Sequence, residues 1–143
     1  MKLSTRCRYG TRAMLELARN YLKKPVKRDE ISRNEDISSS YLENILISLK
    51  SRNLIRTVRG ANGGFSLVIA PDKISMYDIV SALEGSIEPV DCIENSNQCT
   101  RSISCTARRF WINFHELQVK LLKDTSLQSL LNMETREQID YSI

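Results

Sequence analysis

The 143-residue sequence has no long uninterrupted run of apolar side chains, and it lacks a P-loop, a Ser/His/Asp set and a spaced pair of carboxylates. A membrane-spanning helix needs about 20 mostly apolar residues, so we expect no membrane association. The missing catalytic sets argue against an enzyme and against a small-molecule substrate. No apolar segment follows the basic start MKLSTRCRYG, so the sequence predicts no secretory signal and a cytoplasmic location, where thiols stay reduced.

Charge is distributed unevenly, although the net charge is only +4. Residues 1–60 carry fourteen Lys and Arg against six Asp and Glu, or +8, whereas residues 61–143 carry seven against eleven, or −4. The basic half is therefore the candidate for binding a polyanion such as nucleic acid. A solvated surface would show the same excess, so the order of the structural elements must decide.

The N-terminal half predicts a helix-turn-helix. A first helix is expected to begin after Ser4 or Thr5 and to end near Lys24, before Pro25. The segment 26–37 has room for only a short helix. An amphipathic helix then follows Ser38, Ser39 or Ser40, and its apolar face contains Leu42, Ile45, Leu46 and Leu49. A short helix, a tight turn and an amphipathic helix are typical of a helix-turn-helix.

A β-hairpin is predicted directly after the helix-turn-helix. In LIRTVRGANGGFSLVI, residues 54–69, two runs rich in β-branched residues flank Gly60, Gly63 and Gly64. A helix-turn-helix followed by a hairpin is the winged-helix arrangement, which lays one helix in the DNA major groove. The expected fold is therefore mainly α with a small β-hairpin.

The candidate DNA contacts lie at the exposed end of the second helix and on the wing. Serine hydroxyls at a helix N-terminus suit phosphates. A glutamate carboxylate only accepts hydrogen bonds, so it suits the amino group of cytosine. Arg59 is the strongest wing candidate, for phosphate or a narrow minor groove. The main set is Ser38, Ser39, Ser40, Tyr41, Glu43, Arg59, Gly60 and Asn62. Further candidates for phosphate contacts are Lys2, Arg6, Arg8, Arg12, Arg52 and Arg56.

The C-terminal half predicts a helix over 75–85, a polar loop over 86–104, a long helix from about Cys105, and a short terminal helix in TSLQSLLNM, residues 125–133. Along the long helix an apolar stripe contains Phe110, Phe114, Leu117 and Leu121, with Trp111 and Leu122 beside it. Such a helix outside a DNA-binding unit indicates a second subunit as partner. We divide the chain into a winged helix-turn-helix domain, 1–84, a cysteine-bearing loop, 85–104, and a dimerisation helix with its tail, 105–143.

Three of the four cysteines lie close together, Cys92, Cys99 and Cys105. Their spacing is too wide for zinc knuckles or ferredoxin runs, so the pattern alone is weak evidence. One loop could still fold the first two back against Cys105 at a helix start, where the helix dipole favours thiolate. Metal or cluster binding, a structural zinc site and unligated thiols all remain open from the spacing.

The sequence resembles the Rrf2 family of bacterial transcription regulators, and specifically its iron–sulfur branch of IscR-like, NsrR-like and RirA-like proteins. The resemblance covers nearly the whole chain and is carried by MKLSTRCRYGTRAMLELA, ISSSYLENILISLKSRNLI, VRGANGGFSL, the three cysteines and CTARRFW. It implies a homodimer that binds double-stranded operator DNA, usually as a repressor. It also implies an iron–sulfur cluster at Cys92, Cys99 and Cys105 that modulates operator binding, and a role for Glu43 in the choice among operators.

The fourth cluster ligand departs from the IscR-like pattern, in which a histidine stands three residues after the third cysteine. Arg108 occupies that position and cannot ligate iron. His115 lies ten residues after Cys105, which is about 15 Å along a continuous helix. Cys7, Glu16 or Asp91 of a second subunit, water or an exogenous thiol remain alternatives. Because three cysteines suffice for a [4Fe–4S] cluster, we favour it over [2Fe–2S].

Two other functions remain open. A CymR-like branch of the family binds DNA without a cluster and is controlled by a docked metabolic enzyme, although those relatives lack the three cysteines. A small electron-transfer protein would leave the basic helix-turn-helix and wing unexplained. The sequence does not reveal the operator, the signal, or whether the cluster-loaded or cluster-free form binds.

Overall fold

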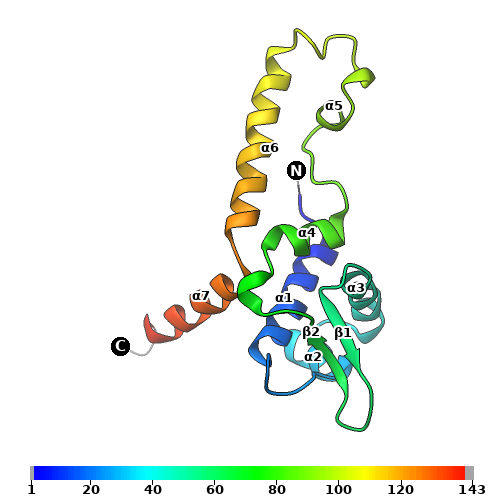
Figure 1. The fold of residues 1–143 in the computed structure, drawn as a ribbon, viewed down its shortest axis with the longest axis vertical. Helices are drawn as coiled ribbons and strands as arrows, with labels where there is room; N and C mark the ends of the chain where they lie inside the picture. Colours follow the sequence, from blue (N-terminus) through cyan, green and yellow to red (C-terminus); the bar gives the residue numbers. More distant parts are fainter. Residues whose placement is uncertain (1, 141–143) are drawn as a thin grey trace.

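The computed structural model describes residues 2–140, with side-chain detail for residues 2–135. The N-terminal part contains α1 (Thr5–Arg19), α2 (Arg28–Glu35), α3 (Ser39–Ser51), β1 (Ile55–Val58), β2 (Gly64–Leu67), the 3-10 turn η1 (Pro71–Lys73) and α4 (Met76–Glu84). The C-terminal part contains α5 (Asp91–Glu94), the 3-10 turn η2 (Ser96–Gln98), α6 (Thr106–Asp124) and α7 (Leu127–Asp140). Figure 1 shows α6 rising away from the N-terminal helices, with α5 near its far end.

Local capping signals fix two of the helix starts. The Ser4 hydroxyl accepts a hydrogen bond from the Cys7 N–H at 3.0 Å, as an N-cap should. Ser75 and Asp78 form a reciprocal capping box at the start of α4, and Gly85 ends that helix with φ +79°. These starts confirm the caps predicted from the sequence. Ser38 does precede α3, but its side chain makes no capping hydrogen bond.

The core lies between α1, α3 and α4. Met14, Leu17, Ile45 and Ile79 are buried there within one apolar cluster. Gly10 allows α1 and α4 to approach closely, because a Cβ on it would lie 2.3 Å from Leu83 Cδ1. Burial of the predicted apolar face of α3 leaves its opposite face in solvent.

The two strands form an antiparallel hairpin in which Ile55 pairs with Leu67 and Val58 with Gly64. The chain before α2 extends the pairing, since Val26 and Phe65 exchange backbone hydrogen bonds of 2.9 and 2.8 Å. This bridge fixes the wing to the helix-turn-helix. The structure thus confirms the predicted fold, a helix-turn-helix followed by a β-hairpin.

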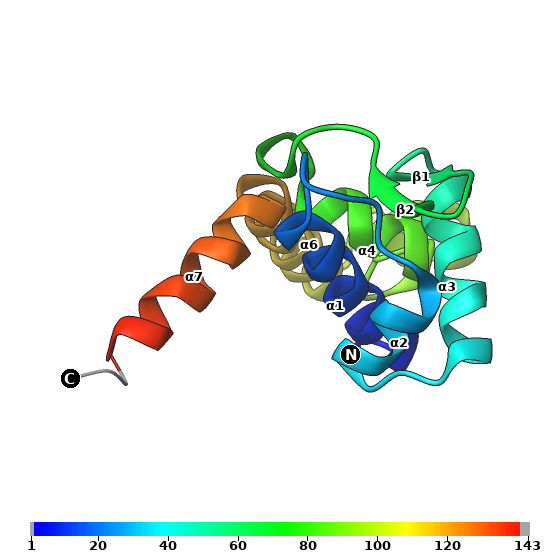
Figure 2. The ribbon, with the colours of Figure 1, turned by 90° about the horizontal axis from the view of Figure 1, so that it is seen from below.

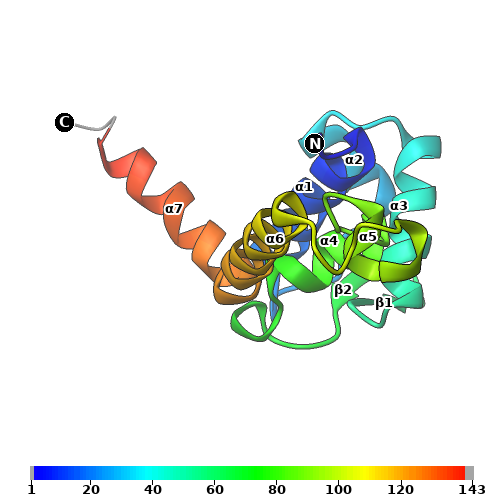
Figure 3. The same cartoon turned by 90° about the horizontal axis from the view of Figure 1, so that it is seen from above.

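The C-terminal helices return to the N-terminal core at one place. The Met76 N–H donates to the Thr125 carbonyl, and the Leu127 N–H donates to the Ile74 carbonyl, each at 2.8 Å. Leu127 is fully buried in the core. Figures 2 and 3 show α7 projecting from this junction, away from α3 and the hairpin.

Three predictions about the extent or type of an element were wrong. Helix α1 ends at Arg19 rather than near Lys24, because the chain turns at Asn20 and Leu22 has a left-handed φ of +61°. The segment 86–104, expected to be a loop without helices, contains α5 and η2, which are too short to leave a periodic apolar pattern. Helix α7, expected to be short, runs to Asp140.

The apolar stripe on α6 is exposed, as the sequence predicts. The exposed fractions of Phe110, Leu117 and Leu121 are 59%, 68% and 67%. Leu122, on the neighbouring face, packs against the core. The division into 1–84, 85–104 and 105–143 stays a prediction, and residues 1 and 141–143 lie outside the described residues. None of the helices in residues 2–140 combines the length and apolarity that crossing a bilayer requires.

Candidate nucleic-acid interface and cysteine loop

The N-terminal end of α3 presents most of its predicted contact residues to solvent. Ser38, Ser40, Tyr41 and Glu43 are exposed, and Ser39 is half-buried. The Ser39 hydroxyl donates to Asp29 at 3.5 Å, and the Tyr41 ring packs edge-on against Tyr9, with ring centroids 5.9 Å apart. The hydroxyl and carboxylate groups of this end are therefore available to a ligand that approaches along the helix.

Glu43 has a cationic partner that sequence spacing did not reveal. The Arg28 guanidinium of α2 lies 3.3 Å from the Glu43 carboxylate, which is 58% exposed. The two residues are fifteen positions apart, so no i,i+4 rule could have found the pair. Together with Lys27, Lys50 and Ile47 they line a groove of about 320 Å³ between α2, α3 and the hairpin.

The wing tip carries the remaining predicted contacts. Arg59, Gly60 and Asn62 are all exposed there. Gly60 has φ +111°, a value that side chains disfavour, and its carbonyl accepts from the Gly63 N–H at 3.0 Å. Gly63 admits no side chain, because a Cβ would lie 2.1 Å from the Val58 carbonyl oxygen. The tip is thus a tight turn that holds Arg59 next to open solvent.

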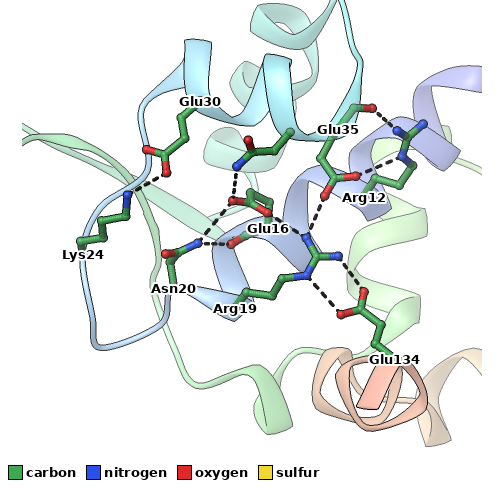
Figure 4. Close-up of polar contacts among 9 residues, drawn as sticks. Arg12, Glu16, Arg19, Asn20, Lys24, Glu30, Glu35 and Glu134 are labelled. Carbon is green, nitrogen blue, oxygen red and sulfur yellow. Dashed lines mark hydrogen bonds and ion pairs between the residues drawn. The ribbon is translucent and has the colours of Figure 1, made fainter. Parts of the chain in front are cut away.

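A partly buried ionic network positions α2, and with it the start of α3 (Figure 4). Arg19 lies 2.8 Å from both Glu16 and Glu35, and 2.7 Å from Glu134 of α7. Glu16 also accepts from Asn34 at 2.9 Å. The network joins α1, α2 and α7 through one guanidinium.

Two residues that the sequence offered for other roles belong to this network. Arg12, a candidate phosphate contact, pairs with Glu35 at 3.2 Å and donates to the Glu35 carbonyl. Glu16, a candidate ligand for the cluster of a second subunit, is 7% exposed and already bonded. Both side chains therefore stabilise the fold of the chain that carries them.

The three clustered cysteines lie in the segment that connects α4 to α6. Cys92 and Cys105 are half-buried, Cys99 is exposed, and none is in a disulfide. Cys105 is the N-cap of α6, where its sulfur accepts from the Arg108 N–H at 3.4 Å. Within residues 2–140 no three His, Cys, Asp or Glu side chains lie close enough together to hold a metal ion. The chain thus supplies the thiols without assembling them around a common point.

Arg108, which replaces the histidine of the IscR-like pattern, has a definite place. Its Nε donates to the Cys92 carbonyl at 2.9 Å, so the side chain ties α5 to the first turn of α6. His115 lies further along α6, well away from the N-cap Cys105, and its ring is 3.9 Å from the Glu88 carboxylate. The pKa of Glu88 is lowered, first by its hydrogen bond from Ser86 and further by His115.

Cys7 is an unfavourable ligand, because it is part of the core. It is 2% exposed, and burial, followed by the nearby Glu84 carboxylate, raises the pKa of its thiol to about 11. Ligation and alkylation both require the thiolate. The two candidate fourth ligands on α1, Cys7 and Glu16, therefore both face the interior of their own chain.

Alkylation kinetics should separate Cys7 from the other cysteines. In metal-free protein at pH 8, with roughly 0.1% of the buried thiol ionised, iodoacetamide is expected to modify Cys92, Cys99 and Cys105 and to spare Cys7. Intact-mass spectrometry should show three additions, and a fourth only after unfolding in guanidinium. A fourth addition to the native protein at the rate of the others would contradict the burial of Cys7.

These features define a winged-helix protein of the DNA-binding class: a helix-turn-helix whose second helix has an exposed polar end, followed by a basic hairpin. The model of the Rrf2 family, described as iron-dependent transcriptional regulator, matches residues 3–133. The chain belongs to the Rrf2 family of transcriptional regulators. It is accordingly a DNA-binding regulator of transcription and not an enzyme.

The chain is similar to two groups of relatives. The HTH-type transcriptional regulator CymR of Bacillus subtilis (strain 168) is 33% identical over 141 residues, which cover 99% of this chain and 97% of CymR. The transcriptional regulator IscR of Aliivibrio salmonicida (strain LFI1238) is 31% identical over 131 residues, covering 92% of this chain and 77% of IscR.

Solved structures give the same two groups. The structure of CymR, the global cysteine regulator of B. subtilis, matches with a TM-score of 0.79 at 32% identity and covers 93% of this chain and 98% of that one. The structure of T. potens IscR matches with a TM-score of 0.76 at 28% identity and covers 96% and 91%. The fold is therefore compatible with both groups and does not distinguish between them.

Proposed function

We propose that this chain is a homodimeric repressor whose affinity for a double-stranded operator is modulated by an iron–sulfur cluster on Cys92, Cys99 and Cys105. The observation that carries the proposal is the position of Cys105, which is the N-cap of the helix that bears the exposed apolar stripe. A change at the cysteine loop therefore acts directly on α6. A repressor of this kind responds to redox state, nitric oxide or iron supply, and the cytoplasmic location expected from the sequence suits it.

The stripe on α6 supports the dimer. Phe110, Leu117 and Leu121 expose large apolar side chains along one helix face, and the Phe110 and Trp111 rings pack together with centroids 5.0 Å apart. An exposed apolar face of this length is characteristic of an interface between subunits. A second copy of the same helix offers a matching face across a two-fold axis. Sedimentation of the purified protein tests the dimer directly.

The donor set supports a cluster. Cys92, Cys99 and Cys105 provide three thiols on one polar segment, none in a disulfide and none in the core. The N-terminus of α6 favours the thiolate form of Cys105. When bound, a cluster would supply an iron site open to exchange, and a [4Fe–4S] cluster fits three cysteines better than [2Fe–2S]. Arg108 already holds the Cys92 backbone beside the first turn of α6.

A continuous path of packed elements leads from the cysteine loop to the DNA-reading helix. The loop precedes α6, α6 packs on α4, and α4 packs on both α1 and α3. Ligation of all three cysteines would fix the loop to α6, and α6 would set the separation of the two α3 helices in a dimer. That separation must match half-sites one helical turn of DNA, or a multiple of it, apart.

Operator binding by loaded and cluster-free protein tests this coupling. Duplexes selected from a random library by each form would be titrated against both forms without oxygen. We expect affinities that differ by at least fivefold, within the range usual for coupling between two sites. Equal affinity of both forms for every selected duplex would overturn the regulation by a cluster and leave DNA binding intact.

A second function, a CymR-like regulator without a cluster, has specific support. The similarity to CymR extends over 99% of the chain, and the described residues do not gather the cysteines around a metal. In that case the signal would arrive through a protein partner or through thiol chemistry at the exposed Cys99. Protein that stays colourless after anaerobic reconstitution would favour this function.

Replacement of Arg59 with Ala is expected to weaken binding to all duplexes to a similar extent. If Arg59 contacts a phosphate, the slope of log K against log salt should fall by about one per protomer. Fluorescence anisotropy across a salt series measures the slope. Lys73→Ala is the matched control, because Lys73 is exposed on η1 and outside the wing. Equal slopes for Arg59→Ala and the unmodified protein would contradict the contact.

A further inference from the structure

Ile47 is an apolar side chain in an unexpected place, the middle of the solvent face of α3. It is 60% exposed, whereas Ile45, Leu46 and Leu49 of the same helix are buried. At about 100° per residue, Ile47 lies near the centre of the exposed arc that runs from Lys50 to Asn44. A β-branched residue on a helix surface brings no gain in helix propensity, so neither local nor core stability accounts for it.

The surroundings of Ile47 are polar and cationic. On one side lies the groove lined by the cations of Lys27, Arg28 and Lys50, the carboxylates of Asp29 and Glu43, and by Leu46, Thr57 and Phe65. On the other side a hollow of about 470 Å³ is also lined by Arg6, Tyr41, Asn44 and Ser48. Ile47 lines both hollows and therefore stands between them, and it is the exposed aliphatic side chain among their lining residues, since Ile45 and Leu46 are buried. One exposed aliphatic side chain among Lys and Arg side chains is a poor site for a protein partner, whereas a cationic surface suits DNA.

We propose that Ile47 contacts the 5-methyl group of a thymine in the major groove and so helps to determine which operator the chain reads. The inference rests on α3 being the reading helix, as proposed above. Thymine is the base that presents an apolar group in the major groove, and apolar side chains recognise it by contact. Ile47 is one helical turn beyond Glu43 and on the same face, about 6 Å along the axis. The thymine should therefore lie within about two base pairs of any cytosine that Glu43 reads.

Replacement of thymine by uracil removes this methyl group alone and leaves base pairing unchanged. Duplexes would first be selected from a random library with the unmodified protein, and each thymine of the selected site would then be changed to uracil in turn. We expect one position per half-site at which affinity falls about fourfold, the factor for burying one methyl-sized group, about 0.8 kcal/mol at 1.4 kcal/mol per tenfold. Ile47→Ala should bind thymine and uracil duplexes equally at that position.

The control variant is Ile69→Ser, because Ile69 is a similarly exposed isoleucine, 45%, outside α3. It should keep the full loss on uracil, and thermal unfolding of Ile47→Ala should match that of the unmodified protein. An equal uracil effect in Ile47→Ala and the unmodified protein, or no sensitive thymine at all, overturns the proposal while DNA binding stands. Failure to select any duplex would overturn both this inference and the reading by α3.

Discussion

Protein purified without oxygen is expected to be brown, and replacement of any one of Cys92, Cys99 or Cys105 by Ser is expected to make it colourless. The physical reason is the number of ligands. The proposed set is only three thiols on one segment, and the other candidates on α1, Cys7 and Glu16, are buried in the core or bonded within it. Loss of one thiolate leaves two, too few to retain iron through purification. Visible absorption, with iron and sulfide counted per chain, gives the measurement.

Cys7→Ala is the matched control for the cysteine replacements. It removes a thiol from the core and should lower the stability of the fold, but it should leave the colour and the iron content unchanged. A folded Cys7→Ala protein that has lost its iron would show that Cys7 is a ligand. A colourless unmodified protein after reconstitution would remove the cluster from the proposed function and favour the CymR-like function.

Replacement of Arg19 with Met is expected to lower the free energy of unfolding by about 3 kcal/mol, a large share of the stability of a small protein. Met keeps much of the length of the side chain but makes no ion pair. Glu16 and Glu35, which are 7% and 8% exposed, would be left with less charge compensation in the interior. We place the loss at the low end of the range for buried pairs, because the Arg19 side chain is itself 38% exposed. Guanidinium denaturation followed by circular dichroism measures it.

Lys120→Met is the matched control for Arg19→Met. Lys120 also forms an ion pair, with Asp124 at 2.7 Å, but both side chains are exposed on α6. Solvent screens such a pair, so its loss should leave the denaturation midpoint within experimental error when protein concentrations are equal. Equal midpoints for Arg19→Met and Lys120→Met would show that the network around Arg19 contributes no more than a surface pair.

The sequence predicted the structural features that depend on residues close to one another along the chain. Apolar spacing placed α3 and α6, and Ser75 and the glycines of the hairpin located a cap and a tight turn. The exposed end of α3 followed from its buried face. Each of these features depends on residues within one or two turns of each other, where periodicity and capping rules apply.

The sequence could not predict contacts between distant segments. Arg19 and Glu134 are 115 residues apart, and the partner of Glu43 is Arg28 on another helix. The residue types of Arg12 and Glu16 made them candidates for a phosphate contact and for a cluster ligand, yet both side chains form ion pairs within the fold. For the cysteines, spacing placed all three in one segment, but it carries no information about how their sulfur atoms are arranged.

The return of the chain after α6 makes the N-terminal core depend on residues at the C-terminal end of the chain. Leu127 completes the core where α7 packs on α1 and η1, and Glu134 completes the ion pairs of Arg19. Cleavage near Thr125 would detach both from the N-terminal helices. The N-terminal part would then lose a piece of its own interior, so the DNA-binding half should not survive as a stable fragment. One cut at this junction is therefore expected to destabilise the whole N-terminal part, although it lies outside the helix-turn-helix and the hairpin.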